Sequence, residues 1–422
     1  MEQTLFTEIL PLYKSKKNHP YAIRIRMQMR DMVDAAALRY AVDITMKRYP
    51  YFCVRLQEDG DGFVFVDNPS PVVISRLPHG VDLNSEASNY HMVSFSCDAD
   101  WLIMDIFHGL TDAAGAYEVI RTLLYYYCSC RYGVQLSAQG IRTANDEIPL
   151  AEWECPVMKA ANLPTPKRYD MPQPLNLHAA AHLRDEKIST VYSILTSEPD
   201  FMRFNRANGA SPGTMVSLLL SRAIAKLFPD SKETIRMILC VNQRQALHAP
   251  LAHQSLVGGA FLEYGEILRN RPLPQQIKAY REMVLDQTSE EKVLAGVSAT
   301  VGLTKMLLSE KATEKRNGLA VFADEMASRA GTSCVSYAGK ANFGEAEKYV
   351  REFHLWCYNS LPVTVEISAV NGIFTFDFIQ KFRSPIYVNA FQEELDAHGI
   401  SYDLQDGMVQ ELPNIRLPWI ES

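Results

Sequence analysis

A single histidine at the end of an apolar run is the residue best placed to do chemistry in this chain. The run 101–107 is short, apolar and followed by a breaker, which predicts a mostly buried strand that ends at His108. Gly109 and the small residues at 113–115 then allow a close turn into a helix that runs to about 131. A general base must be held within hydrogen-bond reach of the proton that it removes. The pattern therefore predicts acid–base chemistry at His108.

Asp112 follows His108 by four residues, giving an H-x-x-x-D pattern across the predicted turn. As a bare pattern it is weak, because a chain with 10 histidines contains about half such a match by chance. Its occurrence between a strand and a helix favours a functional role. The alternative interpretation is that His108 is a hydrogen-bonded core residue and that Asp112 caps the helix, where its carboxylate accepts backbone N–H groups. Local sequence leaves both interpretations open.

Length and charge limit the classes of protein to which the chain can belong. At 422 residues it is too long for one ordinary hydrophobic core, and two domains are expected. Its net charge of -7 argues against nucleic acid as the main partner, although a local basic patch for a phosphorylated co-substrate stays open. No stretch approaches 18 uninterrupted apolar residues, so no membrane span is expected. The N-terminal segment lacks the pattern of a secretory signal.

The eight cysteines are dispersed and lie mostly in apolar surroundings. We interpret them as reduced thiols of a cytoplasmic protein, since disulfides are rare in that compartment. Cys128 and Cys130 are close together, but no second pair of cysteines or histidines at ligand spacing accompanies them. No metal site is therefore predicted.

The hydrophobic pattern predicts two lobes of α+β structure joined by a proline-rich linker. The first lobe covers 1–155 and opens with an alternating strand at 21–30, one face apolar and the other basic, followed by a helix from Asp34 to the residues before Pro50. Residues 156–185 carry prolines with little periodicity and are interpreted as the linker. The second lobe covers 186–422.

Further elements are expected in both lobes. In the first lobe they are a hairpin at 51–57 and 63–67 and a strand at 91–97. In the second lobe they are strands at 188–196, 234–241, 333–338, 362–370 and 373–380 and helices at 198–208, 212–228, 273–288, 291–309, 310–316 and 384–397. The order of the strands within the sheets cannot be read from the pattern.

Several short motifs occur in an order that resembles a known superfamily. R-Y-P-Y-F at 48–52 ends the first helix, the H-x-x-x-D pattern follows, V-N-Q-R at 241–244 comes after a later strand, and V-S-Y-A-G at 335–339 precedes a strand pair and a final helix. This order resembles the chloramphenicol acetyltransferase-like superfamily, which includes condensation domains of nonribosomal peptide synthetases and BAHD acyltransferases of plants. Free-standing alcohol or polyketide O-acyltransferases are the most similar group, because they too are single chains of comparable length.

The resemblance implies a fold and an activity. Each lobe is expected to be like one chloramphenicol acetyltransferase subunit, a mixed sheet with flanking helices, and the two to form a V-shaped pseudo-dimer with a central tunnel. The implied activity is acyl transfer from a thioester to an alcohol or amine. His108 matches the histidine that removes the proton of the acceptor, and Asp112 matches a residue that points away from the cavity and holds the loop through an arginine.

The resemblance also implies the partners of the protein. The acyl donor would be acyl-CoA or the phosphopantetheine thioester of an acyl carrier protein, used as a co-substrate, with no permanently bound cofactor. The acceptor would be a small molecule. A monomer is expected, because two lobes in one chain replace the neighbouring subunits that single-lobe relatives need.

Support for the site is expected from both lobes. The candidate partners for Asp112 are three arginines, Arg244 after a strand of the second lobe and Arg24 and Arg26 on the first strand. The residues expected to support the site structurally are Arg244, Asn242 and Gly115. The alternative for Asn242 and Arg244 is a solvated strand end, since an arginine is costly to bury without a partner.

Acyl transfer also needs a hydrogen-bond donor to the tetrahedral oxyanion. Ser336 is the candidate, a backbone N–H is its competitor, and an ordinary hydroxyl at a strand end is the alternative interpretation of Ser336. Gly258 and Gly259 either permit a close backbone approach where the chain crosses between lobes or form only a turn.

The chain also departs from the superfamily pattern. Phe107 occupies the place of the second histidine of condensation domains, Ala113 replaces a glycine, and Tyr337 replaces an asparagine. The plant-type Asp-Phe-Gly-Trp-Gly motif is absent. These changes weigh against a peptide-forming domain and a BAHD enzyme, and they leave a second function open, a non-catalytic binding protein for a carrier protein or small ligand. The sequence contains neither the G-x-S-x-G pattern of serine hydrolases nor a G-x-G-x-x-G that follows a strand, as in dinucleotide enzymes.

Overall fold

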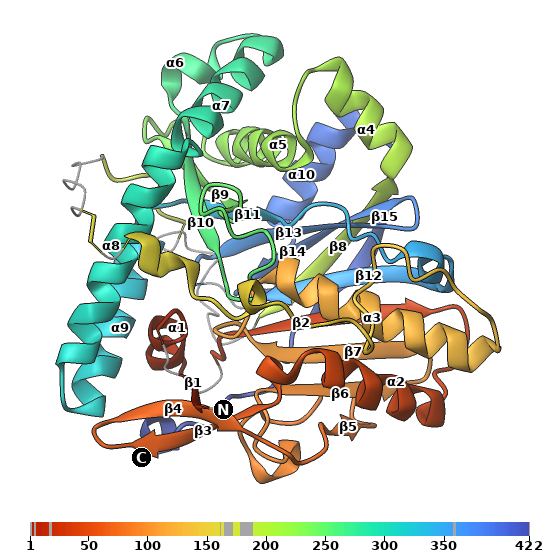
Figure 1. The fold of residues 1–422 in the computed structure, drawn as a ribbon. Helices are drawn as coiled ribbons and strands as arrows, with labels where there is room; N and C mark the ends of the chain where they lie inside the picture. The colour runs from red at the N-terminus through yellow and green to blue at the C-terminus, as the bar shows by residue number, and fades with distance from the viewer. Residues whose placement is uncertain are drawn as a thin grey trace.

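Two large β-sheets dominate the computed structural model, one in the lower and one in the upper half of Figure 1. The structure describes residues 2–3, 6–16, 19–160, 162–163, 172–177, 189–357 and 360–421. Most of the predicted linker 156–185 therefore lies outside the described residues, apart from a short 3₁₀ helix, Pro156–Ala160, and the segments 162–163 and 172–177.

The five-stranded sheet has the order β12-β2-β7-β6-β5. Its strands are β2 (Ala22–Met29), β5 (Ile74–Ser75), β6 (Val93–Asp98), β7 (Trp101–Phe107) and β12 (Val350–Cys357). Two helices, α2 (Ala35–Arg48) and α3 (Ala113–Tyr132), contact each other and share one hydrophobic core with this sheet. The strand that precedes His108 thus lies inside a well-packed layer rather than at an edge.

The seven-stranded sheet has the order β10-β9-β11-β13-β14-β8-β15. Its strands are β8 (Thr190–Ser197), β9 (Ile235–Asn242), β10 (Val257–Tyr264), β11 (Ser333–Tyr337), β13 (Val363–Val370), β14 (Ile373–Gln380) and β15 (Asp403–Val409). The helices that share its core are α4 (Glu198–Ala207), α5 (Pro212–Leu227), α7 (Leu273–Gln287) and α10 (Ile386–Ala397).

The remaining elements surround these two layers. A three-stranded sheet has the order β1-β4-β3, formed by β1 (Glu2–Gln3), β3 (Val54–Asp59) and β4 (Gly62–Asp67). The other helices are α1 (Ile9–Lys14), α6 (Glu266–Arg269), α8 (Glu290–Ser309), α9 (Thr313–Ser328) and α11 (Pro418–Glu421).

The two sheets do not divide the chain at residue 186. Strand β12 belongs by sequence to the second lobe, yet it pairs antiparallel with β2 at the edge of the five-stranded sheet. The boundary 186–422 for the second lobe is corrected to this extent. The physical reason is that the edge of β2 needs a hydrogen-bonding partner, and β12 supplies it while it also packs against β13 and β14 of the other sheet.

Several elements were missed or misplaced by the sequence pattern. Of the two alternatives for Gly258 and Gly259, the turn is wrong, because both lie in the edge strand β10, whereas Gly258 does permit a close approach, by the Gln243 side chain. Strand β15 was missed because most of its residues are exposed, and β12 because it mixes charged and apolar residues. The helix expected at 310–316 is α9, Thr313–Ser328, whose buried residues are only Arg316 and Ala320, too few to produce a helical period.

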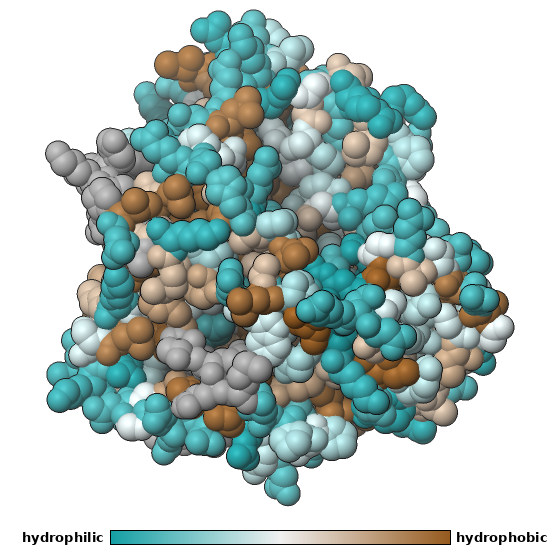
Figure 2. Space-filling view, in the orientation of Figure 1, coloured by the Kyte–Doolittle hydropathy of each residue, from teal (hydrophilic) through white to brown (hydrophobic). Residues whose placement is uncertain are grey.

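Helix α8 is the only helix among the described residues that is long and apolar enough to cross a membrane. This is weak evidence for a span, because core helices of soluble proteins meet the same criterion, and a third of its most apolar window is buried. On the face drawn in Figure 2, apolar residues form separate patches among hydrophilic ones.

The basic face of the first strand is partly enclosed, since Arg24 is buried, Arg26 is half-buried and Arg30 is exposed. Arg24 is buried and forms an ion pair with Asp105, its direct neighbour on β7, at 2.7 Å. Arg26 lies between the rings of Trp101 and Trp356, with its guanidinium 4.3 and 4.5 Å from their centroids. Both arginines are therefore occupied away from Asp112, which corrects their candidacy as its partner.

A buried histidine joins the two sheets next to these arginines. His354 on β12 hydrogen-bonds through Nδ1 to Asp377 on β14 at 2.9 Å, and Ser193 on β8 donates to the same Asp377 oxygen at 2.5 Å. Burial opposes protonation of the imidazole, but the Asp377 carboxylate outweighs it and raises the pKa of His354 to about 9. At neutral pH an imidazolium–carboxylate pair thus connects β12 to the seven-stranded sheet.

This pair predicts a pH dependence of stability. A histidine pKa raised from 6.5 contributes stability that is fully present below pH 6.5 and is lost as pH rises through about 9. We expect the wild type to lose about 1–3 kcal/mol of unfolding free energy across this window. His354→Gln should flatten that slope in urea titrations, and the exposed-site control His248→Gln should keep it; an unchanged slope in His354→Gln contradicts the assignment.

Candidate active site

A cavity of about 860 Å³ lies where the two sheets meet, and both lobes line it. The first lobe contributes Tyr21 and His108, and the second contributes Asn242, Ser336 and Glu366. This volume is in the range of small-molecule sites. The predicted residues His108, Asn242 and Ser336 are therefore brought to one cavity, although more than 130 positions separate the first of them from the others in the sequence.

His108 is held from two sides at the end of β7. Its backbone N–H donates to the Tyr21 carbonyl at 2.8 Å, and its ring stacks on the Tyr21 ring with centroids 4.8 Å apart. Its Nδ1 lies 2.9 Å from the Thr111 carbonyl oxygen. A carbonyl can only accept, so Nδ1 carries the proton and Nε2 keeps its lone pair. The ring is thereby fixed in the tautomer that a general base in this cavity requires.

Burial lowers the pKa of His108 below its usual 6.5. Contacts with backbone groups and the charge of Asp112 oppose this effect without reversing it, and the nearby Lys14 ammonium adds to it. The imidazole is therefore neutral at pH 7. A neutral imidazole is the form that can accept a proton.

The carboxylate of Asp112 has a structural role and takes no part in proton transfer. Oδ1 caps α3 by accepting the Gly115 N–H at 3.1 Å, and Oδ2 accepts the Leu256 N–H at 2.9 Å. Both oxygens also accept from Arg244, at 2.8 and 2.9 Å, and the two side chains are buried. The acceptor capacity of the carboxylate is thus used by three partners. Of the three candidate arginines, Arg244 is the one that contacts Asp112.

Arg244 is itself held by its own segment of the second lobe. It donates to the carbonyl oxygens of Ala252 at 3.1 Å and Gln254 at 2.9 Å. The side chain of Asn242 accepts the Arg244 backbone N–H at 3.0 Å. The two carbonyls thus hold the guanidinium in position to pair with Asp112, and the ion pair fixes one lobe against the other.

Gly115 permits a close approach between the lobes. A Cβ at this position would lie 2.1 Å from Thr111 Oγ1 and 2.8 Å from the carbonyl oxygen of His253. Both distances are far below van der Waals contact, so only a glycine fits the present backbone. Glycine is needed at position 115 because there is no room for a Cβ, and not because the backbone is left-handed there.

The turn at His108 is supported by a second layer of residues, Thr111, His253 and Glu152. The sequence pattern did not predict this layer. Thr111, whose carbonyl holds the His108 ring, donates its hydroxyl to the His253 carbonyl at 2.8 Å. His253 is buried, stacks on Tyr51, and hydrogen-bonds through Nδ1 to the Glu152 carbonyl. Burial lowers the pKa of His253 to about 4, so it is a neutral packing group. The Thr between His108 and Asp112 was the sequence signal available for part of this layer.

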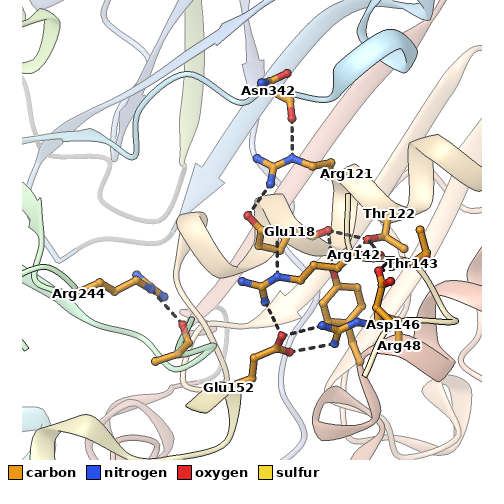
Figure 3. A network of polar contacts seen from close by, with 12 residues as sticks. Arg48, Glu118, Arg121, Thr122, Arg142, Thr143, Asp146, Glu152, Arg244 and Asn342 are labelled. Atoms are coloured by element: carbon orange, nitrogen blue, oxygen red, sulfur yellow. Dashed lines mark hydrogen bonds and ion pairs between the residues drawn. The ribbon is translucent and has the colours of Figure 1, made fainter. Parts of the chain in front are cut away.

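The R-Y-P-Y-F motif holds that layer in place. Arg48 forms a bidentate ion pair with Glu152 at 2.7 and 2.9 Å, and the Tyr51 hydroxyl donates to the same carboxylate at 2.9 Å. Figure 3 shows how Arg142 continues the network from Glu152 to Glu118 on α3. The motif therefore has a structural role, since Arg48 and the Tyr51 hydroxyl hold Glu152, whose backbone carbonyl is bonded to His253.

Ser336 lies near the end of β11 and lines the cavity. Its direct neighbour across the parallel strand pair is Glu366 on β13, and the Ser336 hydroxyl is close enough to lower the pKa of the Glu366 carboxyl. Glu366 is buried and was not singled out in the sequence, because it lies inside an otherwise apolar strand. Gly258 and Gly259 also line the cavity, from the edge strand β10, and the Gln243 side chain covers Gly258.

The described cysteines are free thiols. Cys240 and Cys334 line the cavity from neighbouring strands with their sulfurs 3.6 Å apart. The hydrogen bond with the Cys240 thiol, together with burial, holds the pKa of Cys334 well above its usual range, so it is protonated. Among the residues that the structure describes, no cluster of three or more histidine, cysteine or acidic side chains could hold a metal ion.

No protein-family model and no curated protein sequence matches the chain. Many known structures do resemble it, among them the following three. Polyketide synthase associated protein 5 from Mycobacterium tuberculosis is 13% identical, with 94% of this chain and 96% of that chain covered and a TM-score of 0.59. TRI101 of F. graminearum, complexed with coenzyme A and T-2 mycotoxin, is 12% identical, with 95% and 99% covered and a TM-score of 0.60. The condensation domain of the Monacolin K polyketide synthase MokA is 12% identical, with 94% and 96% covered and a TM-score of 0.60.

The chain shares its fold with these three proteins, one of which is a condensation domain. The predicted two-lobed α+β architecture is thereby confirmed. Identities of 12–13% establish the fold alone. In this condensation-type fold, the cavity described above lies between the two lobes.

Gly115 offers a test of the close approach. Gly115→Ala should lower the unfolding free energy by about 1–3 kcal/mol, because the new methyl group forces Thr111 and the His253 segment apart. Gly318→Ala is the matched control, since it lies in α9 with no atom within 4 Å of its new Cβ and should be neutral or stabilising by up to about 1 kcal/mol. Urea unfolding measures both. Equal stability of Gly115→Ala and wild type contradicts the packing argument.

The Asp112–Arg244 pair offers a second test. Arg244→Met should cost about 3–5 kcal/mol of stability, because it leaves a buried carboxylate without its cation. The control is Arg416→Met, which breaks a partly exposed pair with Asp82 and should cost about 0–1 kcal/mol. If the two variants unfold at the same denaturant concentration, the pair does not fix the lobes as described.

Proposed function

We propose that this protein is an acyltransferase that moves an acyl group from a thioester to a hydroxyl or amine, with His108 as the general base. The observation that supports this most directly is the tautomer of His108, whose Nδ1–H is bound by the Thr111 carbonyl while Nε2 is left for a ligand in the cavity. The shared fold with coenzyme A-bound TRI101 and with a polyketide synthase condensation domain supports the same class of reaction.

The proposed reaction is one of proton transfer and nucleophilic attack without an acyl-enzyme. Nε2 of His108 takes the proton of the acceptor O–H or N–H as its oxygen or nitrogen bonds to the thioester carbonyl carbon. The tetrahedral intermediate collapses with cleavage of the C–S bond, and the imidazolium returns the proton to the leaving sulfur. The products are an ester or amide and a free thiol. The Ser336 hydroxyl is the proposed donor to the oxyanion, and a backbone N–H is its competitor.

The proposed donor is acyl-CoA or a carrier-protein phosphopantetheine thioester, and the proposed acceptor is a small molecule. The supporting comparison is TRI101, whose structure holds coenzyme A together with T-2 mycotoxin. The cavity volume of about 860 Å³ suits a drug-sized acceptor. We further propose that the protein acts as a cytoplasmic monomer, in line with its free thiols and with two lobes in one chain.

His108→Ala tests the proposal. Loss of a general base should lower the rate of thiol release about 10²- to 10⁴-fold, measured with DTNB on acyl-CoA across a panel of alcohols and amines. His248→Ala is the matched control, since that side chain is 71% exposed and lies outside the cavity. Wild-type activity should persist below pH 6.5, because the pKa of His108 is lowered.

Unchanged activity in His108→Ala would identify the alternative function, a non-catalytic binding protein. If acyl-CoA or acyl-pantetheine binds in calorimetry but its consumption is equal in wild type and His108→Ala for every acceptor, the catalytic proposal fails. The chain is then a binding protein with a condensation-type fold.

A further inference from the structure

The carboxyl group of Glu366 lines the cavity and has no role in the reaction proposed above. It lies in the middle of β13, is 7% exposed, and lines the cavity. Among the described residues, no lysine, arginine or histidine forms an ion pair with it. A buried carboxyl group without a cation must be neutral or be stabilised by hydrogen bonds.

The strand register places Glu366 directly beside the proposed oxyanion donor. Ser336 on β11 and Glu366 on β13 are partners in a parallel pair, so their side chains are on the same face of the sheet. The Ser336 hydroxyl is close enough to the Glu366 carboxyl to lower the pKa of that group, so the two can exchange a hydrogen bond. The two groups therefore form one unit at the cavity wall.

The positively charged groups near Glu366 have other partners, and Lys14, which lines the same cavity, pairs with Asp324 at 3.4 Å. Asp377 faces it from β14 as its direct antiparallel partner, and His354 on β12 is committed to Asp377. The neutral thiols of Cys334 on β11 and Cys357 on β12, and the phenol of Tyr117 on α3, complete this environment. Burial raises the pKa of Glu366 to about 7, and the hydrogen bond from Ser336 opposes that shift only in part.

The protonation state of Glu366 decides what Ser336 can do. A hydroxyl group has one proton to donate. When Glu366 is ionised, that proton is directed to the carboxylate and is lost to the cavity. When Glu366 is protonated, its own O–H can donate to the Ser336 oxygen, and the serine proton is free to turn toward an oxyanion.

We propose that Glu366 is a positioning residue, which in its protonated form directs the Ser336 hydroxyl toward the oxyanion of the reaction. This inference rests on the proposed acyl transfer and adds a second ionisable group to it. No net proton transfer to or from Glu366 occurs during turnover, because only the orientation of its hydrogen bond with Ser336 changes.

The test is the pH profile of kcat/KM for thiol release. The wild type should rise with pH through the lowered pKa of His108 and fall above about pH 7, so that its rate at pH 8 is about tenfold below the maximum. Glu366→Gln supplies a permanent amide donor to Ser336 and should lose the alkaline fall. Glu291→Gln, an exposed carboxyl group on α8, should keep the wild-type profile.

Ser336→Ala makes the test specific. This variant should lose about 100-fold or more in rate and also the alkaline fall, and Glu366→Gln should change nothing further in its background. An alkaline limb that survives in Glu366→Gln, or an equal effect of that change with and without Ser336, overturns the inference while leaving His108-dependent acyl transfer intact. No His108-dependent turnover in any variant overturns both.

Stability supplies a readout that does not need activity. An acid whose pKa is raised in the folded state loses stability as pH rises from the unfolded value of about 4.5 to about 7. The thermal midpoint of Glu366→Gln relative to wild type should therefore increase between pH 5 and pH 8. A constant difference across that range shows that Glu366 is ionised throughout and contradicts the inference.

Discussion

The bidentate ion pair between Asp112 and Arg244 is the interaction on which the candidate site depends. Both side chains are buried, and a buried ion pair adds little net stability, because each charge has lost its water. The ion pair instead fixes the positions of the two segments that it joins. The same carboxylate accepts the N–H groups of Gly115 and Leu256, so it joins the start of α3 to the second lobe. The turn with His108 and Thr111 lies between β7 and this junction, and it is therefore fixed at both ends.

The chemistry of His108 follows from this constraint. The Thr111 carbonyl can hold the Nδ1–H of the ring only if the turn keeps its shape, and the Thr111 hydroxyl is tied in turn to the His253 carbonyl. A neutral imidazole with one nitrogen occupied has a single direction in which to accept a proton. The supporting contacts thus select the tautomer and the orientation together. A freely rotating histidine in the same cavity would lose part of its effect as a base, because proton transfer needs close geometry.

Features that depend on residues adjacent in the sequence could be predicted. Features that depend on how strands pair and sheets pack could not. The strand before His108 and the cap at Asp112 could be predicted because an apolar run, a glycine and a capping aspartate follow one another directly. Arg244 could be named only as one of three candidates, since the pairing depends on how β9 lies against the first lobe. The role of β12 depends on a crossover between sheets, which leaves no periodic signal. Glu366 was missed because a buried polar residue in an apolar strand has no pattern of its own, and Thr111 and His253 were missed because their contact joins segments far apart in the sequence.

Hydrophobic packing alone does not explain the residues on one face of the seven-stranded sheet, the face that carries Glu366 and Asp377. A sheet covered on both sides is normally apolar on both faces, yet Glu366 and Asp377 face each other across the central strands here. Oδ1 of Asp377 accepts hydrogen bonds from Ser193 and His354, which gives the residue a structural role between the sheets, while its buried Oδ2 has no hydrogen-bond partner among the described residues. Glu366 has a neutral hydroxyl for a partner and lies at the cavity. Because burying an unpaired carboxyl group costs free energy without adding packing, its position is better explained by chemistry at the cavity than by stability.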